Sequence, residues 1–239
     1  MKVAIMQPYF FPYLGYWQLI HAADAFVLFD DAQYIRHGWI NRNRILKPGG
    51  GWQYIIAPLR KHAPTDAIRA IETQPGDEWK SLILRQLAHY KKGARHFAQT
   101  SETVQALLFG APSQGIGALN LSILAGICEL LGLRRRISLS SSMGFDYRDV
   151  TDAGEWALQM AEQMGASEYI NPVGGAELFD PAKFTRRGIG LSFLAPEEVT
   201  YPQAGANEPG LSIIDVLMFN GVEGTRALLP RYSLQRAVS

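Results

Sequence analysis

Residues 1–44 decide the fold and read MKVAIMQPYFFPYLGYWQLIHAADAFVLFDDAQYIRHGWINRNR. The apolar run Val3–Met6 predicts a short buried strand. A helical pattern follows over Tyr16–Ala23, and a second apolar run, Ala25–Phe29, stops at an acidic pair. The order strand, loop, helix, strand predicts a βαβ unit whose polar residues lie just beyond the strand ends.

Strand and helix patterns alternate through the rest of the chain. Further strands are expected at Tyr54–Ala57, Ile137–Leu139, Glu168–Ile170 and Gly190–Leu194, with Ala67–Ile71 as an ambiguous short one. Helices are expected from Asp77 to Gly93, over Ser101–Phe109, over Ile116–Leu131, from Asp152 to Gly165 and over Ser212–Asn220. This alternation predicts an α/β fold with a doubly wound, mostly parallel, Rossmann-like sheet. We expect residues 1–57 and 132–230 to form the core, residues 58–131 a largely helical insertion, and residues 231–239 a loosely held tail.

Composition excludes several classes of protein. The 239 residues are 47% hydrophobic and 19% charged, with a net charge of +1, which argues against a nucleic-acid partner or broad attraction to anionic membranes. The single cysteine, Cys128, excludes a disulfide within the chain and a multi-cysteine metal site. No apolar stretch reaches the roughly 18 residues of a membrane helix. A strand pattern begins at once, so we expect no signal peptide and a cytoplasmic location.

The acidic pair Asp30-Asp31 is the strongest local indication of chemistry. Ligands of parallel sheets bind beyond the carboxyl ends of the strands, where this pair falls. One carboxylate could act as a base or hold a substrate hydroxyl; the alternative is that both are solvated turn residues. His37 is the histidine best placed for acid–base work.

A polar and aromatic cluster follows the acidic pair. It combines arginine for an anion, amides for hydroxyls and rings for stacking, which suits a phosphate or a nucleotide-sugar. Single-stranded nucleic acid would use similar groups, and an ordinary surface loop is the simpler alternative. The binding residues expected here are Gln33, Trp39, Asn41, Arg42 and Asn43.

Two further loops follow expected strands. Ser141 belongs to a run of three serines, and Asn171, Gly174 and Gly175 belong to an Asn-Pro-Val-Gly-Gly segment. Hydroxyls and backbone N–H groups of such loops can bind an anion or a carbonyl oxygen, although each loop could also be only a turn. Asp215 lies among apolar residues and needs a partner if it is buried.

Several motifs together resemble one known family. They are the opening I-M-Q-P-Y-F-F-P-Y-L-G-Y, then A-D-A-F-V-L-F-D-D-A-Q-Y and G-W-I-N-R-N, and later G-A-S-E-Y-I-N-P-V-G-G-A-E-L and L-S-I-I-D-V-L-M-F-N-G. In combination these motifs are similar to the WbqC-like family over most of the chain. The matching positions are Gln7, Pro8, Tyr9, Pro12, Gly15, Tyr16, Asp24, Asp30, Asp31, Gln33, Trp39, Asn41, Arg42, Asn43, Tyr169, Gly174, Gly175, Ser212, Asp215 and Gly221.

The resemblance implies a bacterial protein linked to surface-polysaccharide biosynthesis. It implies a transferase that joins an activated acyl or aminoacyl group, such as glycine, to an amino sugar through an amide bond. Such chemistry needs a base and donors for an oxyanion. We expect the base to be Asp30, Asp31 or His37, with Gln7, Tyr13 and Tyr16 orienting the acceptor or donating to the oxyanion. The expected partners are a free or nucleotide-linked amino sugar and an acyl-carrier protein that supplies a phosphopantetheine thioester; no cofactor or metal of the protein's own is expected.

A fainter likeness concerns the fold. Tyr13-Leu14-Gly15-Tyr16 opens the first helix in the way that the H-x-G-H motif does in a group of nucleotidyltransferases. Both histidine positions carry tyrosine, which cannot supply a cation at neutral pH. Nucleotidyl transfer therefore stands as one alternative function, and a non-catalytic module that binds a sugar nucleotide or a carrier protein stands as another.

Overall fold

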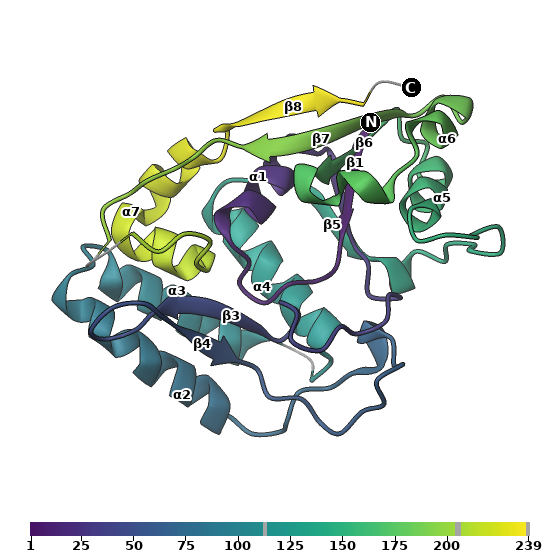
Figure 1. Cartoon of the computed structure of the whole chain (residues 1–239). Helices are drawn as coiled ribbons and strands as arrows, with labels where there is room; N and C mark the ends of the chain where they lie inside the picture. Colours follow the sequence, from purple (N-terminus) through teal and green to yellow (C-terminus); the bar gives the residue numbers. More distant parts are fainter. Residues whose placement is uncertain (112–113, 204–206, 238–239) are drawn as a thin grey trace.

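A mostly parallel sheet organises the chain, in a computed structural model that describes residues 1–111, 114–203 and 207–237. Its strand order is β5-β2-β1-β6-β7-β8 (Figure 1). All neighbours pair in parallel except β8, which runs antiparallel to β7. The predicted α/β, Rossmann-like fold is therefore confirmed. The strands are β1 (Lys2–Met6), β2 (Ala25–Leu28), β5 (Arg136–Leu139), β6 (Glu168–Pro172), β7 (Gly190–Pro196) and β8 (Tyr232–Arg236).

Helices cover both faces of this sheet because the strands are apolar on both sides. In β1, Val3 and Ile5 face one hydrophobic cluster and Ala4 faces the other, as the two-residue period of a strand requires. The cluster around Ala4 is covered by α1 (Leu14–Ala22), α4 (Ile116–Leu130) and α7 (Ile213–Leu228), and the cluster around Val3 by α5 (Glu155–Gln163) and α6 (Pro181–Arg186). Burial of each large apolar side chain stabilises the fold by about 1.5–3 kcal/mol.

A smaller layer extends the first cluster. The antiparallel hairpin of β3 (Arg42–Leu46) and β4 (Trp52–Ile56) packs with α2 (Glu78–Leu87) and α3 (Phe97–Gly110) into the same apolar cluster as α4 (Figure 1). The expected strand near residue 54 is present as β4, but it pairs outside the main sheet. Four short 3-10 turns complete the described elements: η1 (Ile68–Ala70), η2 (Ala88–Lys92), η3 (Ser140–Ser142) and η4 (Val173–Leu178).

Three local expectations are wrong. The tail is not loosely held, because β8 pairs with β7 along its whole length. Its sequence, YSLQR, carries one large aliphatic residue and lies at the sheet edge, so no alternating apolar pattern marks it. The segment around residue 69 is a 3-10 turn, whose backbone bonds to residues 30 and 32 instead of to a sheet. Finally, Arg42–Leu46 is a strand and not the ordinary surface loop that was the simpler alternative for the polar cluster.

Candidate functional site

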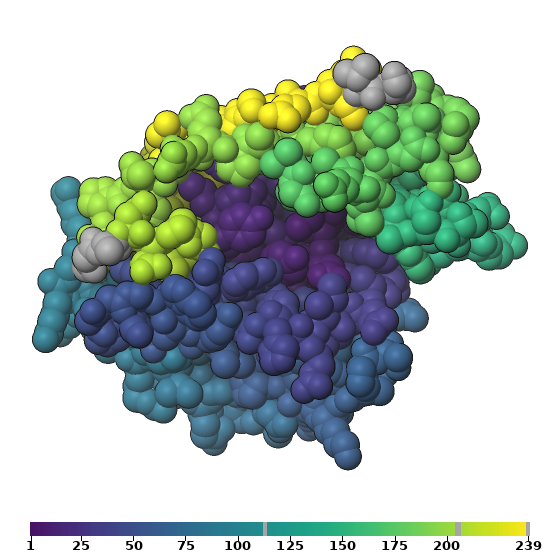
Figure 2. All heavy atoms as spheres, viewed as in Figure 1, coloured from purple at the N-terminus to yellow at the C-terminus, as the bar shows by residue number. Residues whose placement is uncertain are grey.

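The carboxyl ends of the parallel strands open onto one edge of the molecule. Figure 2 shows a hollow there, with N-terminal residues (purple) on its floor. Its rim is formed by the region of the β3–β4 hairpin (indigo), by the segment after β6 (green) and by the start of α7 (lime). We call this feature the carboxyl-edge hollow. A ligand in a doubly wound fold is expected at this edge of the sheet.

Asp30 ties the end of β2 to the end of β5. Its side chain is 1% exposed. Oδ1 accepts hydrogen bonds from Ser140 Oγ and the Ser141 backbone N–H, both at 3.0 Å, and Oδ2 accepts from Ser141 Oγ at 2.6 Å. Gly117 in the first turn of α4 packs against the carboxylate, where a Cβ would lie 3.6 Å from Oδ2. Both oxygens of Asp30 are therefore occupied by the protein itself.

Asp31 is the more open member of the pair, with its side chain 13% exposed. Its Oδ2 accepts from Ser140 Oγ at 2.8 Å and from Tyr147 Oη at 2.9 Å, and Arg69 Nε lies 3.4 Å from Oδ1. Ser140 has one hydroxyl proton but contacts both carboxylates, so it can donate to only one of them at a time. Burial is the main reason that the pKa of the Tyr147 hydroxyl is raised, and the hydrogen bond to Asp31 raises it further. Tyr147 therefore remains a neutral donor.

Sequence analysis missed three members of this network. Ser140 directly precedes the predicted Ser141, and the serine run is the signal that could have included it. Tyr147 and Arg69 lie 116 and 38 residues from Asp31 along the chain, in segments with no motif of their own. Only the pairing of β2 with β5, and of residues 30–32 with the turn at Ile68–Ala70, brings them together.

The loop after β1 presents polar groups that the protein leaves free. Gln7, Tyr9 and Tyr13 are half-buried, and within the described residues their side chains make no hydrogen bond. Burial raises the pKa of both tyrosines, for Tyr9 with a further contribution from Tyr13, so both phenols are neutral near pH 7. The loop thus offers one amide and two neutral O–H donors just beyond the carboxyl end of β1.

Two buried asparagines hold this loop in place. Asn43 Nδ2 donates to the carbonyls of Phe10 and Phe11, at 3.0 and 2.9 Å, and Asn120 Nδ2 donates to the carbonyl of Pro8 at 2.8 Å. Phe11 has a φ of 42°, a left-handed conformation that is unfavourable for a bulky residue. The hydrogen bonds from the two asparagines hold the backbone in that conformation. An unfavourable backbone conformation persists only where the surrounding structure holds it in this way.

Tyr16 faces away from the hollow. Its ring is 1% exposed in the core, and its hydroxyl donates to the Gln7 carbonyl at 2.9 Å. Burial raises its pKa well above that of free tyrosine. Gly15 allows the neighbouring Tyr13 ring to approach, since a Cβ there would lie 2.7 Å from Tyr13 Cε2. The two tyrosines of the Y-L-G-Y motif therefore point to different surroundings, and only Tyr13 keeps a free hydroxyl.

The polar residues before the hairpin are mainly bonded to the backbone. Asn41 accepts from Tyr34 Oη at 2.8 Å and donates to the Ala57 carbonyl at 3.0 Å. Arg42 lies 4.3 Å over the Tyr54 ring and donates to the carbonyls of Gly38 and His37. The His37 ring is exposed and makes no hydrogen bond with any described residue, and its φ of 63° turns the chain sharply. Gln33, also exposed, donates to the Pro64 carbonyl.

Arg44 is a cation that sequence analysis missed. Its guanidinium lies 5.3 Å from the ring centres of both Trp39 and Trp52. One Nη donates to the Gly210 carbonyl at 3.3 Å, while the buried Nε has no partner among the described residues. Arginine held by aromatic rings keeps its charge and its planar donors. Arg44 is therefore better placed than Arg42 to bind an anion.

The segment after β6 supplies backbone to the rim of the hollow. Asn171 accepts from Tyr169 Oη at 2.9 Å and donates to the Pro172 carbonyl at 3.0 Å. A Cβ at Gly175 would collide with Asn171 Nδ2, whereas Gly174 is exposed and has open space around its Cα. Gly175 is thus needed for packing, and Gly174 leaves the backbone accessible.

A small pocket lies at the end of β7. It has a volume of about 230 Å³ and is lined by Tyr13, Tyr201 and Glu208, among others. Asp215 lies behind it, fully buried, and accepts from Tyr90 Oη at 2.6 Å and Tyr201 Oη at 2.7 Å. Burial raises the pKa of Asp215, and these bonds oppose the rise. Asp215 has the partners that its burial requires, and it anchors the loop before α7.

Comparison with known proteins places the chain in a family. The model of the WbqC-like protein family matches residues 7–227. The chain belongs to the WbqC-like protein family. One relative, the uncharacterized protein Rv1507c of Mycobacterium tuberculosis (strain ATCC 25618 / H37Rv), is 29% identical over 224 residues, which cover 93% of this chain and 95% of that protein. No solved structure matches the chain significantly.

Two further properties of this WbqC-like chain come from its described residues. None of its described helices is both long and apolar enough to cross a bilayer. Over the same residues, no three His, Cys, Asp or Glu side chains gather in a way that could hold a metal ion. The thiol of Cys128 is buried, and burial raises its pKa to about 12, which makes it a poor nucleophile.

Proposed function

We propose that this WbqC-like protein is a transferase that forms an amide between an activated acyl or aminoacyl group and the amine of an amino sugar. The observation that carries the proposal is the set of free, neutral donors in the loop after β1: Gln7, Tyr9 and Tyr13. A sugar presents several hydroxyls to such groups. Neutral phenols can also donate to an oxyanion without the charge repulsion that a phenolate would cause.

The reaction moves one acyl group. The amine nitrogen of the sugar attacks the carbonyl carbon of a thioester, and a C–N bond forms in a tetrahedral intermediate. The C–S bond then breaks, and the thiolate leaves with the bonding electrons and takes a proton. Tyr13, with its free hydroxyl, would donate to the oxyanion during this sequence.

A base must remove the proton that the attacking amine loses. Between the two carboxylates, Asp31 suits this role better, because its side chain is 13% exposed whereas Asp30 is buried. His37, exposed and free of side-chain bonds, is the other candidate. The carboxylate of Asp30 would position Ser140, the serine that contacts Asp31.

Arg44 would bind the phosphates if the sugar is nucleotide-linked. Its charge is held between Trp39 and Trp52, and its Nε lacks a partner. Charge-assisted bonds from arginine to phosphate are short and strong. The nucleotidyltransferase alternative is weaker, because the Tyr16 hydroxyl, at the second motif position, is buried and bonded to Gln7.

The test uses defined probes. The protein is incubated with a UDP-amino sugar and the acetyl or glycyl thioester of N-acetylcysteamine, and thiol release is measured together with the mass of the sugar nucleotide. We expect a mass increase of one acyl group per thiol released. Tyr13→Phe should lower the rate about a hundredfold to a thousandfold, because one oxyanion donor is lost.

The comparison variants separate the roles. Asp31→Asn should abolish acyl transfer if Asp31 is the base, whereas full activity in Asp31→Asn and loss in His37→Gln would transfer that role to His37.

Arg44→Gln should raise the KM for the UDP-sugar, and Lys47→Gln, which removes an exposed charge next to the hairpin, should not. ATP consumption with pyrophosphate release would favour nucleotidyl transfer. Tight binding of the UDP-sugar without turnover would favour a binding module.

A further inference from the structure

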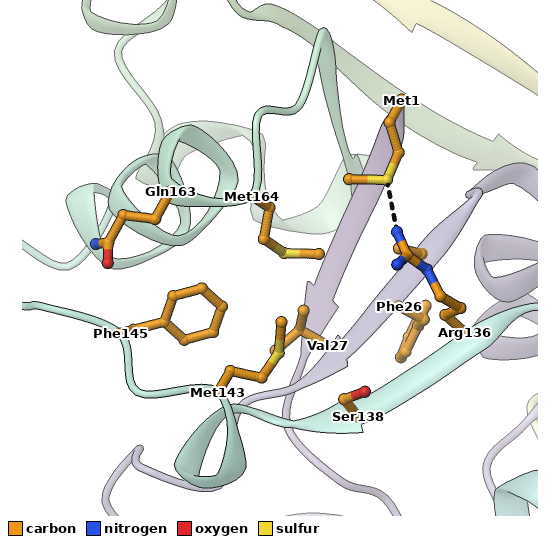
Figure 3. Close-up of a pocket in the computed structure, with 10 residues that line it drawn as sticks. Met1, Phe26, Val27, Arg136, Ser138, Met143, Phe145, Gln163 and Met164 are labelled. Atoms are coloured by element: carbon orange, nitrogen blue, oxygen red, sulfur yellow. Dashed lines mark hydrogen bonds between the residues drawn. The ribbon is translucent and has the colours of Figure 1, made fainter.

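A second cavity lies on the α5 face of the sheet, away from the carboxyl-edge hollow. Figure 3 shows it over β2 and β5, with side chains from Val27 and Ser138 at its base. Its volume is about 320 Å³. Pockets for small molecules begin at about 300 Å³, so the cavity suits a small ligand.

The cavity exists because the sheet is uncovered at this position. Ile137 and Leu139 of β5 pack toward the cluster around α4, so Arg136 and Ser138 face the opposite side. On that side α5 packs on β6 and α6 on β7. In the described part of the chain, the space over β5 is bordered only by the end of α5, residues 143–145 and Met1.

The walls combine adaptable apolar side chains with polar groups. Met143, Met164 and Met1 surround the space, and the Phe145 ring closes one side (Figure 3). Methionine side chains are flexible and polarizable, and they accommodate ligands of varied shape. Met143 is 38% exposed, which places it at the mouth of the cavity.

One end of the cavity carries a cation without a counter-ion. Arg136 donates to Met1 Sδ at 3.3 Å and forms no ion pair with any described residue. A thioether is a weak acceptor, and the exposed guanidinium therefore keeps donors free for a stronger one. The Ser138 hydroxyl also has no hydrogen bond within the described ranges. By contrast, the Gln163 amide is occupied by the backbone N–H and C=O of Asp146, at 2.9 and 2.7 Å.

We propose that this cavity binds a small amphipathic carboxylate. The apolar tail would lie against Met143, Met164 and Phe145, and the carboxylate would replace the Met1 thioether as the partner of Arg136. Ser138 would donate a second hydrogen bond. Charge complementarity decides the class of ligand, because a carboxylate can accept a charge-assisted hydrogen bond from this exposed guanidinium and a neutral apolar molecule cannot.

Calorimetry with straight-chain acids tests the proposal. Butanoate, hexanoate and octanoate should bind with affinity rising about fourfold per added methylene until the cavity is filled. Octanol, which has the same tail and no charge, should bind about tenfold to a hundredfold more weakly than octanoate. Methyl NMR of the methionines gives the location: the signals of Met143 and Met164 should shift, and that of the buried Met218 should not.

Two matched variants make the test decisive. Arg136→Gln should weaken octanoate binding about tenfold to a hundredfold without changing octanol binding. Arg134→Gln removes the same charge two residues away, outside the cavity, and should change neither. Equal effects of the two variants, octanol binding as tight as octanoate binding, or no saturable shift of the Met143 and Met164 signals up to millimolar acid would each overturn the proposal.

Discussion

The loop at residues 7–13 and the segment at residues 41–43 both carry several side chains that can form hydrogen bonds, yet they relate to the protein in opposite ways. In the first, the side chains of Gln7, Tyr9 and Tyr13 stay free and the backbone carbonyls are bonded. In the second, the Asn41 and Asn43 side chains bond to carbonyls of neighbouring loops. A dense polar motif can therefore be a binding surface or the scaffold that holds one, and hydrogen-bond partners distinguish the two.

The largest effect should come from breaking the scaffold at Asn43. Asn43→Ala removes both bonds to the loop, leaves the Phe10 carbonyl without a side-chain donor and leaves the Phe11 carbonyl with only Ser212 Oγ, so we expect a loss of about 2–4 kcal/mol in the free energy of unfolding. Urea denaturation followed by circular dichroism measures it. Asn41→Ala should cost less, because that site is only partly buried. If Asn43→Ala were as stable as the exposed-site control Gln33→Ala, the scaffold role would be refuted.

A smaller effect is expected at the two glycines after β6. Gly175→Ala places a methyl group against Asn171, which is pinned by Tyr169 and Pro172, and should destabilise the fold by about 1–3 kcal/mol. Gly174→Ala enters open space and should stay within about 0.5 kcal/mol of the parent protein. Thermal unfolding of the two variants side by side checks the pair. Equal melting temperatures would show that the segment adjusts and that Gly175 has no packing role.

The strands of the fold also differ in how far the local sequence predicts them. The runs Val3–Met6 and Ala25–Phe29 predict buried parallel strands because both faces of each strand are apolar, and the structure has β1 and β2 there. Strand Arg42–Leu46 begins with polar residues, and Tyr232–Arg236 is an exposed edge strand, so neither carries a hydrophobic pattern. Their pairing depends on tertiary contacts that the local sequence does not encode.

Site residues divide in the same way. Asp30 and Asp31 directly follow an apolar strand pattern, which predicts that they lie at the carboxyl edge of the sheet. In the structure they follow β2 at that edge. The partners of Asn43 lie 32 and 33 residues away in the sequence, and whether its amide is free or bonded depends on where that loop packs. Arg44 gains its importance from two tryptophans on either side of it in the chain, and their placement comes from the hairpin register.

The smallest effect, and the sharpest test of the comparison, comes from single hydroxyl groups of one motif. Tyr16→Phe removes the bond to the Gln7 carbonyl and should lower the free energy of unfolding by about 1 kcal/mol. Tyr13→Phe removes a hydroxyl that bonds to nothing in the described chain, so its free energy of unfolding should stay within about 0.5 kcal/mol of the parent value while its ligand binding falls. Urea denaturation and UDP-sugar calorimetry on both variants give the two readouts. The opposite pattern, with Tyr13→Phe less stable and Tyr16→Phe weaker in binding, would exchange scaffold and binding surface within the motif and remove the basis for placing substrate on the floor of the hollow.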